Sequence, residues 1–336
     1  MAEAAHTQLD STRVSEARER RDGSTSPGSA TDVAALEATF AKMKAAYKRE
    51  PNPSYAVRMA RLDKLLDLVR DNQDRIASAI SQYFSCRSQH ETKICEVFTL
   101  VTSIKYIRGN LKDWMKPQAR HVPMTFQPGR AKVHYHPLGV VGVISPWNYP
   151  VSLALGPLAI ALAAGNRVMI KPSELTPRTS DLLAELIAKT FSPDLVSVVT
   201  GGPEIGQAFS EVPWDHLLYT GSTRVGKFVM QAAAKNLTPV TLELGGKSPT
   251  LVHESYPIEK AAERIATGKW INAGQTCIAP DYVLVPESRR DELIAALERV
   301  TARFYPTLKN NPDYSAVVNE AHYARLRGHI DDAVAR

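Results

Sequence analysis

The sequence predicts an α/β protein built around a doubly wound parallel sheet. Between Gly139 and Leu244, short runs rich in β-branched residues alternate with longer runs that have helical spacing. Amphipathic helical patterns precede this region, and a second alternation of the same kind starts beyond Gly246. Such alternation is the sequence sign of parallel strands joined by crossover helices. We therefore expect a parallel sheet that is preceded by helices and followed by an incomplete second α/β unit.

The composition is that of an ordinary globular protein. The chain has 336 residues, of which 44% are hydrophobic and 23% are charged, and this length predicts two or three domains. The net charge of +6 is spread along the chain rather than gathered in one basic block, so no nucleic-acid partner is expected. The three cysteines, an odd number at irregular spacing, predict neither a disulfide framework nor a metal site. They fit a reducing, cytoplasmic location.

The chain before the sheet divides into three segments. Residues 1–33 are rich in Ser, Thr, Glu and Arg and lack the apolar run of a signal peptide, so we expect a disordered tail. Residues 34–115 repeat apolar side chains at helical spacing, which predicts a set of amphipathic helices. Residues 116–136 carry alternating Val, Phe and Tyr around Pro128 and Gly129, which predicts an extended β-hairpin arm that packs on a partner.

The predicted sheet occupies residues 137–246, with strand patterns in the runs VVGVIS, RVMIK, VSVVT and HLLYT. The longest apolar stretch, from Val151 to Ala164, is shorter than the roughly 20 residues that span a bilayer and contains Pro157. We therefore expect a buried helix there and no membrane segment in this chain. Ligands of doubly wound sheets bind at the carboxyl ends of the strands, so residues 137–246 are expected to form a dinucleotide-binding core.

Residues 247–336 begin another α/β unit. The runs SPTLV and DYVLVP are strand-like, and helical patterns extend from about Ile258 to Trp270 and from Arg289 to Phe304. A loop that holds Cys277 lies between the first of these helices and the second strand.

Cys277 is a candidate nucleophile. A reactive thiolate needs solvent access and nearby positive charge or backbone N–H groups, and a loop between two elements supplies these conditions. Inert packing is the commoner role of a single cysteine, and the loop by itself leaves both roles open. Cys86 and Cys95 fall in helical patterns, for which we expect a structural role.

Glu243 lies between apolar residues at the end of a strand pattern, in the run LELGGKSP. A carboxylate in that setting is expected to be partly desolvated, which raises its pKa toward the range useful for a general base. The glycine pair Gly245 and Gly246 allows another group to approach the backbone closely. The alternative is a strand-end glutamate paired with Lys247.

Two further segments lie where a cofactor would bind. Gly221 to Gly226 follows HLLYT and opens a helix, so backbone N–H groups and the Ser222 hydroxyl are available to an anion such as a pyrophosphate. Lys171 and Glu174 follow the strand RVMIK, at the carboxyl end where cofactors bind. The first segment fits an ordinary capped helix start equally well, and the second fits a surface turn.

Asn148 stands between two prolines in the run SPWNYP. Held by that turn, its side-chain N–H could be presented to a developing oxyanion. A lone asparagine in a turn is more often structural.

Taken together and in order, SPWNYP, KPSE, GSTRVG, LELGGKSP and GQTCIAPDYVLV resemble the aldehyde dehydrogenase superfamily. The resemblance runs from about Ala34 to the last residue, and the spacing between Glu243 and Cys277 is also that of the family. The runs GQTCIAPDY and YPTLKNNPDY are similar to the branch that acts on aromatic aldehydes, such as coniferyl aldehyde, and on long-chain aliphatic ones. The resemblance implies an aldehyde dehydrogenase-like fold, with an oligomerisation arm in residues 116–136 and the first part of a catalytic domain in residues 247–336.

The same resemblance implies a role for each candidate residue. Cys277 is the nucleophile, Glu243 the general base and Asn148 the oxyanion donor, in the oxidation of an aldehyde to its acid through a thiohemiacetal and a thioester. Lys171 and Glu174 are implied to bind the adenine-side ribose of NAD. The acid disfavours a 2′-phosphate and the lysine offsets part of that repulsion, so NADP remains possible. The residues implied to lie near the pyrophosphate are Trp147, Gly221, Ser222, Thr223, Arg224, Val225 and Gly226.

The sequence departs from the family pattern at its end. It stops at Arg336 without the EIFGP segment, whose acid in the family holds the nicotinamide-side ribose. From the resemblance, the expected function is that of an aldehyde dehydrogenase. Its full-length form is expected to be a homo-oligomer, a dimer. The alternatives are a non-catalytic nucleotide-binding fragment of such an enzyme and a cysteine hydrolase that acts on esters with the same thiol.

Overall fold

The computed structural model describes residues 31–83, 86–309 and 311–336. Most of the tail predicted for residues 1–33 lies outside the described residues. Its last residue, Val33, already belongs to a helix, because the Asp32 side chain accepts a hydrogen bond from the Ala35 backbone N–H and so caps the helix start.

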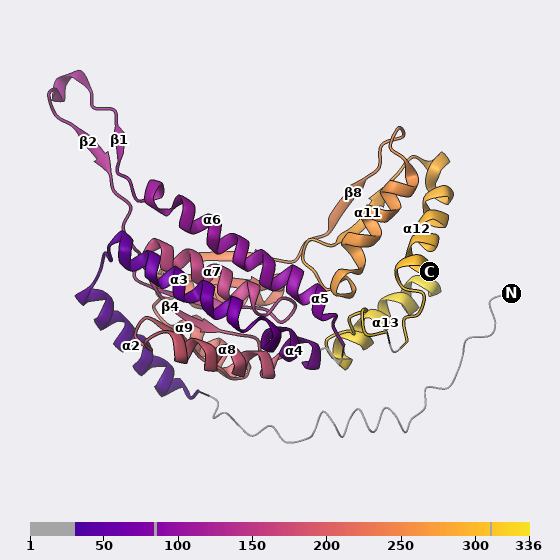
Figure 1. Ribbon diagram of the computed structural model, residues 1–336, viewed down its shortest axis with the longest axis horizontal. Coiled ribbons are helices and arrows are strands. Elements are labelled where there is room, and N and C mark those ends of the chain that lie inside the picture. Colours follow the sequence, from indigo (N-terminus) through magenta and orange to yellow (C-terminus); the bar gives the residue numbers. More distant parts are fainter. Residues whose placement is uncertain (1–30, 84–85, 310) are drawn as a thin grey trace. The chain divides into compact units, whose positions relative to one another are not determined.

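The helices predicted for residues 34–115 are confirmed (Figure 1). They bury one apolar face each, as Leu62, Leu65 and Val69 show with no exposed surface. The prediction that Cys86 lies in a helix is wrong, because this residue lies in the irregular segment between two helices. The elements are α2 (Val33–Arg49), α3 (Tyr55–Asp71), α4 (Gln73–Tyr83), α5 (Gln89–Thr92), the π-helical η1 (Lys93–Phe98) and α6 (Thr99–Trp114).

A short antiparallel pair follows, formed by β1 (Gln118–Arg120) and β2 (Ala131–Val133), with Gln118 opposite Val133. The expected hairpin is therefore present, but its paired strands are shorter than the sequence pattern suggested. The chain reverses through a 3-10 turn, η2 (Met124–Phe126), and Gly129 N–H donates to the Phe126 carbonyl oxygen at 2.8 Å. Pro128 and Gly129 thus complete the loop rather than form the whole turn.

The predicted parallel sheet is confirmed, with five strands in the order β5-β4-β3-β6-β7. The chain starts in the middle, at β3, and adds strands first on one side and then on the other. Such a switch in strand order opens a crevice beyond the carboxyl ends of the central strands. The strands are β3 (Val140–Ile144), β4 (Arg167–Lys171), β5 (Val196–Val198), β6 (His216–Gly221) and β7 (Val240–Leu244).

Crossover helices cover both faces of this sheet. One apolar cluster packs α3, α6, α7 and α8 against β3 and β4, and a second packs α2, α9 and α10 against β6. The expected buried helix is α7, which ends where Gly165 adopts the left-handed conformation with φ +92°. Within the described residues no helix is long and apolar enough to cross a membrane. The crossovers are α7 (Ser152–Ala164), α8 (Pro177–Thr190), α9 (Pro203–Glu211) and α10 (Thr223–Ala234).

The last part of the chain forms the beginning of a second α/β unit. Strands β8 and β9 pair in parallel, and α11 and α12 pack together over an apolar cluster of their own. The strands and helices predicted here are confirmed, while the helix α13 has no counterpart in the sequence expectations. The elements are β8 (Ser248–Leu251), α11 (Ile258–Trp270), η3 (Ile271–Gly274), β9 (Pro280–Leu284), η4 (Glu287–Arg289), α12 (Arg290–Phe304) and α13 (Glu320–Ala335).

Candidate active site

The candidate residues of the sheet lie at the carboxyl ends of its parallel strands. Asn148 follows β3, Lys171 ends β4, Ser222 follows β6, and Glu243 is the last but one residue of β7. Because the strands are parallel, these ends share one edge of the sheet, and β3 is the strand at which the order switches. The topology therefore brings four separate sequence motifs to one edge.

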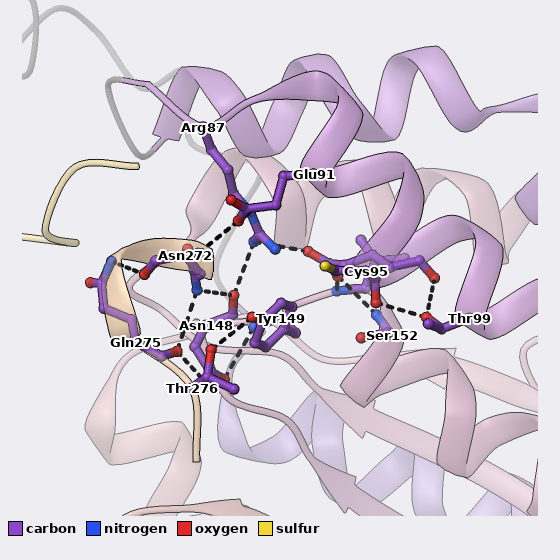
Figure 2. Close-up of polar contacts among 12 residues, drawn as sticks. Arg87, Glu91, Cys95, Thr99, Asn148, Tyr149, Ser152, Asn272, Gln275 and Thr276 are labelled. Carbon is purple, nitrogen blue, oxygen red and sulfur yellow. Dashed lines mark hydrogen bonds and ion pairs between the residues drawn. The ribbon is translucent and has the colours of Figure 1, made fainter. Parts of the chain in front are cut away.

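The turn after β3 contacts the loop that carries Cys277 (Figure 2). Asn148 Nδ2 donates a hydrogen bond to the Gln275 carbonyl oxygen at 3.0 Å. The hydroxyl groups of Tyr149 and Thr276 lie 2.7 Å apart, within hydrogen-bond distance. Thr276 precedes Cys277 directly, so the turn that holds the candidate oxyanion donor also fixes the loop of the candidate nucleophile.

The environment of Tyr149 keeps its phenol protonated. Burial raises the pKa of Tyr149 to about 12, although the hydrogen bond with Thr276 acts in the opposite direction. The hydroxyl is therefore a neutral hydrogen-bonding group across the whole physiological range.

The Cys277 loop starts from a strained turn. Asn272 and Ala273 both adopt left-handed backbone conformations, with φ near 50°, which costs non-glycine residues roughly 1–2 kcal/mol each. The buried Asn272 side chain offsets part of this cost, since its Nδ2 donates to the Asn148 carbonyl oxygen at 3.1 Å and to the Gln275 carbonyl oxygen at 3.3 Å. The strain is thus balanced by contacts with the turn after β3.

Gln275 connects the same loop to the segment after α12. Its Nε2 donates to the Ala316 carbonyl oxygen at 3.0 Å, and its Oε1 accepts a hydrogen bond from Val318 N–H at 2.9 Å. Cys277 itself is exposed and carries a free thiol. A supported loop that presents an accessible thiol has the properties expected of a nucleophile site.

Glu243 differs from the sequence expectation. Its side chain is exposed in this chain, so the predicted desolvation of the carboxylate is wrong for the described structure. The predicted alternative partner is also wrong, because Lys247 Nζ pairs with Asp281 Oδ1 at 3.2 Å. The physical reason is shared: both residues are exposed at the end of the sheet, and Lys247 pairs with an acid of β9 instead.

The glycine pair after Glu243 does approach the nucleophile loop. A Cβ atom placed on Gly246 would lie 3.0 Å from the Cys277 carbonyl oxygen, whereas a Cβ atom on Gly245 would meet no atom within 4 Å. The expected close approach is therefore confirmed at Gly246. It places the segment after Glu243 against the backbone of Cys277.

The cofactor candidates form two groups at the same sheet edge. Lys171 is 3% exposed, and its Nζ lies 2.5 Å from Glu174 Oε2. Ser222 caps α10, with its hydroxyl accepting a hydrogen bond from Val225 N–H at 3.3 Å. Thr223 and Arg224 are exposed in the first turn of α10, while Gly221 and Gly226 lie at the end of β6 and inside α10.

Trp147 has a neighbour that the sequence did not indicate. Its ring lies 5.1 Å from the ring of His322, on α13, measured between centroids. Burial and the nearby Arg325 lower the pKa of His322, so the imidazole is neutral at pH 7. Trp147 is thus half-buried between the sheet edge and α13.

Sequence reasoning missed a group of largely buried charges beside the site. Arg87 and Glu91 lie next to the turn after β3 (Figure 2), and Arg87 also pairs with the buried Glu96. Burial raises the pKa of Glu91, and the Arg87 guanidinium offsets part of that effect. A signal was present: Ser88 caps α5 and stands three residues before Glu91, the spacing of a capping box, in a helix start too short to attract notice.

The other two cysteines fit the structural role expected of them. Burial raises the pKa of both thiols, and nearby acids act in the same direction, Asp313 at Cys86 and Glu91 at Cys95. Both side chains are therefore neutral thiols at pH 7. Cys277 is the accessible thiol of the three, and it alone lies at the sheet edge with the other candidates.

Fold and site together define a class of protein. A doubly wound parallel sheet presents a helix N-terminus and a buried lysine at its ligand-binding edge, and at the same edge an asparagine amide is hydrogen-bonded to the loop that carries an exposed cysteine. This is the arrangement of a dinucleotide-binding α/β protein with an accessible thiol.

The comparisons with known proteins give the family. The sequence model described as the aldehyde dehydrogenase family matches residues 16–336, and the chain belongs to that family. A protein of Pseudomonas aeruginosa called a probable coniferyl aldehyde dehydrogenase is 54% identical over 302 residues, which is 90% of this chain and 63% of that protein. The chain therefore spans under two thirds of the length of this curated relative.

Solved structures agree with this result. Staphylococcus aureus AldH, solved in a substrate-bound state, has a TM-score of 0.84 and 39% identity, with 88% of this chain and 65% of that one covered. A Mycobacterium tuberculosis aldehyde dehydrogenase complexed with NAD+ has a TM-score of 0.81 and 29% identity, with 91% of this chain and 64% of that one covered. The predicted α/β fold of the aldehyde dehydrogenase type is confirmed.

Proposed function

We propose that this protein oxidises an aldehyde to its carboxylic acid with NAD or NADP, using Cys277 as the nucleophile. The observation that carries the proposal is the contact between the Asn148 amide and the Cys277 loop. An amide nitrogen has two hydrogens. With one on the Gln275 carbonyl oxygen, the other is available to an oxyanion that forms at a carbon bound to Cys277.

The residues of this chain support each step on the substrate. The Cys277 thiolate adds to the aldehyde carbon and forms a thiohemiacetal, whose oxyanion Asn148 Nδ2 stabilises together with backbone N–H groups of the loop. Loss of a hydride from that carbon converts the thiohemiacetal to a thioester. Glu243 then takes a proton from water, the hydroxide attacks the thioester carbonyl, and the C–S bond breaks to release the acid and Cys277.

A nicotinamide dinucleotide fits the sheet edge. When bound, it supplies the acceptor for the hydride that leaves the thiohemiacetal carbon. Lys171 and Glu174 would bind the ribose on the adenine side, since their pairing presents both a donor and an acceptor at the end of β4. The exposed first turn of α10, from Ser222 to Val225, would place the positive end of the helix dipole and the N–H groups of Thr223 and Arg224 at the pyrophosphate. Trp147 and Gly221 would be among the residues near it.

The ion pair between Lys171 and Glu174 bears on the choice of cofactor. The Glu174 carboxylate would repel a 2′-phosphate, and we therefore propose NAD as the preferred cofactor. Because Lys171 Nζ lies 2.5 Å from that carboxylate and offsets part of the repulsion, we propose that NADP is also accepted.

The substrate class rests on similarity to named relatives. The Pseudomonas aeruginosa relative is called a probable coniferyl aldehyde dehydrogenase, and at 54% identity it favours an aromatic aldehyde. A Staphylococcus aureus relative with the name 4,4'-diaponeurosporen-aldehyde dehydrogenase is 40% identical, so the aldehyde in that name is a second candidate substrate. We also propose that the protein is cytoplasmic and acts as a homodimer through the β1–β2 arm.

The test is absorbance of the reduced nicotinamide after the chain is mixed with NAD or NADP and a panel of aldehydes, coniferyl aldehyde and long aliphatic aldehydes among them. The expected result is a signal with aromatic aldehydes that Cys277→Ala abolishes, while binding of NAD, followed by calorimetry, is retained. Cys95→Ala, which removes a half-buried thiol, is the matched control and should keep the signal. A folded chain that binds NAD but gives no signal would support the non-catalytic nucleotide-binding alternative instead.

A further inference from the structure

Two buried charges, Arg87 and Glu96, and the half-buried Glu91 lie beside the candidate site. The Arg87 side chain has no exposed surface, and its guanidinium pairs with Glu91 at 3.3 Å and with Glu96 at 3.1 Å. Burying charges is costly unless they are paired and hydrogen-bonded. The fold maintains this cluster next to the loop of the candidate nucleophile despite the cost. The contacts of the cluster show which segments it holds in place.

One side of the cluster holds the turn after β3. Arg87 Nη1 donates to the Asn148 carbonyl oxygen at 3.0 Å, and the guanidinium carbon lies 4.8 Å from the centre of the Tyr149 ring. Glu96 Oε2 accepts hydrogen bonds from Val151 N–H at 2.8 Å and from Ser152 N–H at 3.0 Å. The cluster therefore fixes both the turn that carries Asn148 and the start of the helix that follows it.

The other side holds the Cys277 loop. Glu91 Oε1 accepts a hydrogen bond from Asn272 N–H at 2.9 Å, at the strained turn where the loop starts. The Asn148 carbonyl oxygen accepts from both Arg87 and the Asn272 side chain. One short chain of contacts thus runs from Asn272 through the charged cluster to Asn148 (Figure 2).

We propose that Arg87 and Glu91 are positioning residues that set the distance between the Asn148 amide and Cys277. This inference rests on the proposed function, since it assigns the cluster to the oxyanion geometry of that reaction. Both side chains act through the backbone of other residues, Arg87 through the Asn148 carbonyl oxygen and Glu91 through the Asn272 N–H. Their shared ion pair links the two segments, so that displacement of one displaces the other.

Lysine cannot replace arginine in this role. The planar guanidinium reaches Glu91, Glu96 and the Asn148 carbonyl oxygen at once, whereas an ammonium group is a single point of charge. Arg87→Lys keeps the charge that the buried Glu96 and the half-buried Glu91 require, so the fold is retained while the bridge is lost. Arg58→Lys is the matched control, because Arg58 is also a buried arginine and donates to the Ala163 carbonyl oxygen at the other end of the helix α7.

The first measurement is hydrogen exchange of backbone amides, read by mass spectrometry on the whole chain. In Arg87→Lys the peptides covering residues 147–152 and 271–277 should both exchange faster, by about fivefold, the effect of losing one typical hydrogen bond. Arg58→Lys should leave both segments at the wild-type rate. The proposed coupling of the two segments is wrong if Arg87→Lys speeds exchange in only one of them. It is also wrong if Arg58→Lys speeds exchange in both segments to the same extent.

The second measurement separates positioning from a general loss of stability. With coniferyl aldehyde and NAD, Arg87→Lys should lower kcat roughly 30-fold and change KM by less than about threefold, since a small displacement of reacting groups costs rate rather than binding. Glu91→Gln, which keeps an oxygen acceptor for Asn272 N–H but removes the charge, should show a smaller fall in kcat. A proportional rise in KM with unchanged kcat in Arg87→Lys would remove Arg87 from the positioning role.

The two measurements also separate this inference from the proposed function. If the wild-type chain forms no reduced cofactor but Arg87→Lys releases both segments, the coupling stands and the proposed function fails. If the wild-type chain is active and Arg87→Lys alters neither exchange nor kcat, the proposed function stands and the positioning role is wrong.

Discussion

Asn148 and Gln275, far apart in the sequence, are joined by a 3.0 Å hydrogen bond from the asparagine side chain to the glutamine carbonyl oxygen. The bond spans the two parts of the chain that supply the candidate oxyanion donor and the candidate nucleophile. It also fixes which way the Asn148 amide faces, because the second amide hydrogen then has a defined direction.

Asn148→Ala should lower kcat by about 100-fold or more, the usual cost of removing one preorganised oxyanion donor. The binding of NAD should change little, because Lys171, Glu174 and the first turn of α10 lie at the ends of other strands and the Trp147 side chain is unchanged. Steady-state kinetics with NAD and coniferyl aldehyde checks this. Asn110→Ala, which removes an exposed amide from α6, is the control and should retain wild-type kcat. Full activity of Asn148→Ala would remove this residue from the mechanism.

Glu243→Gln should separate the two halves of the reaction. Thiohemiacetal formation and its oxidation do not need the carboxylate, but water attack on the thioester does. A stopped-flow trace should therefore show a burst of reduced cofactor with an amplitude close to the enzyme concentration, followed by a slow steady state. Glu211→Gln, at an exposed acid paired with Lys235, should behave as wild type. An unchanged steady-state rate in Glu243→Gln would show that another group activates water.

Gly246→Ala should alter the reactivity of Cys277 even without cofactor. The new methyl group would lie 3.0 Å from the Cys277 carbonyl oxygen, so the loop must shift to accept it. We expect alkylation of Cys277 by iodoacetamide, followed by peptide mass spectrometry, to change at least about threefold, as a free-energy shift of under 1 kcal/mol would cause. Gly245→Ala meets no atom within 4 Å and should leave the rate unaltered. Equal rates in both variants would mean that the loop is held elsewhere.

Tyr149→Phe should reduce the loss of stability at alkaline pH. Burial raises the pKa of Tyr149 from 10.0 to about 12. Below pH 10 both folded and unfolded states keep the proton, and above it the unfolded state loses the proton first, so the stability due to the buried neutral phenol falls as pH rises toward 12. Urea denaturation should show the wild type losing up to about 1.4 kcal/mol more per pH unit than Tyr149→Phe in this range.

The matched control for that measurement is Tyr106→Phe, at an exposed ring on α6. At pH 8 Tyr149→Phe should be less stable than the wild type by about 1 kcal/mol, because the hydrogen bond with Thr276 is lost. Parallel alkaline slopes for wild type and Tyr149→Phe would show that the phenol ionises in the folded state near its ordinary pKa.

The local pattern of the sequence determined much of this protein. Strand runs such as VVGVIS and RVMIK are continuous and β-branched because parallel strands are buried on both faces, and each became a strand of the sheet. The end of α7 at Gly165 could be predicted from the sequence, because glycine adopts the left-handed conformation that ends a helix. The sequence also predicted that Cys277 lies in a loop between a helix and a strand, because the residues of α11 and β9 follow clear helix and strand patterns. These features depend on residues close together in the chain.

Tertiary structure decided how those pieces meet. Arg87, Asn148 and Asn272 come from distant segments, and no local pattern indicates that the side chains of Arg87 and Asn272 both donate to the Asn148 carbonyl oxygen. The sequence suggested a desolvated Glu243, but exposure depends on what packs over the end of a strand and not on the apolar residues beside it. The left-handed turn at Asn272 is unfavourable by local propensity and is stable because Glu91 and Asn148 accept its hydrogen bonds. Residue types therefore determined which groups are available for chemistry, while long-range contacts determined the distances between them.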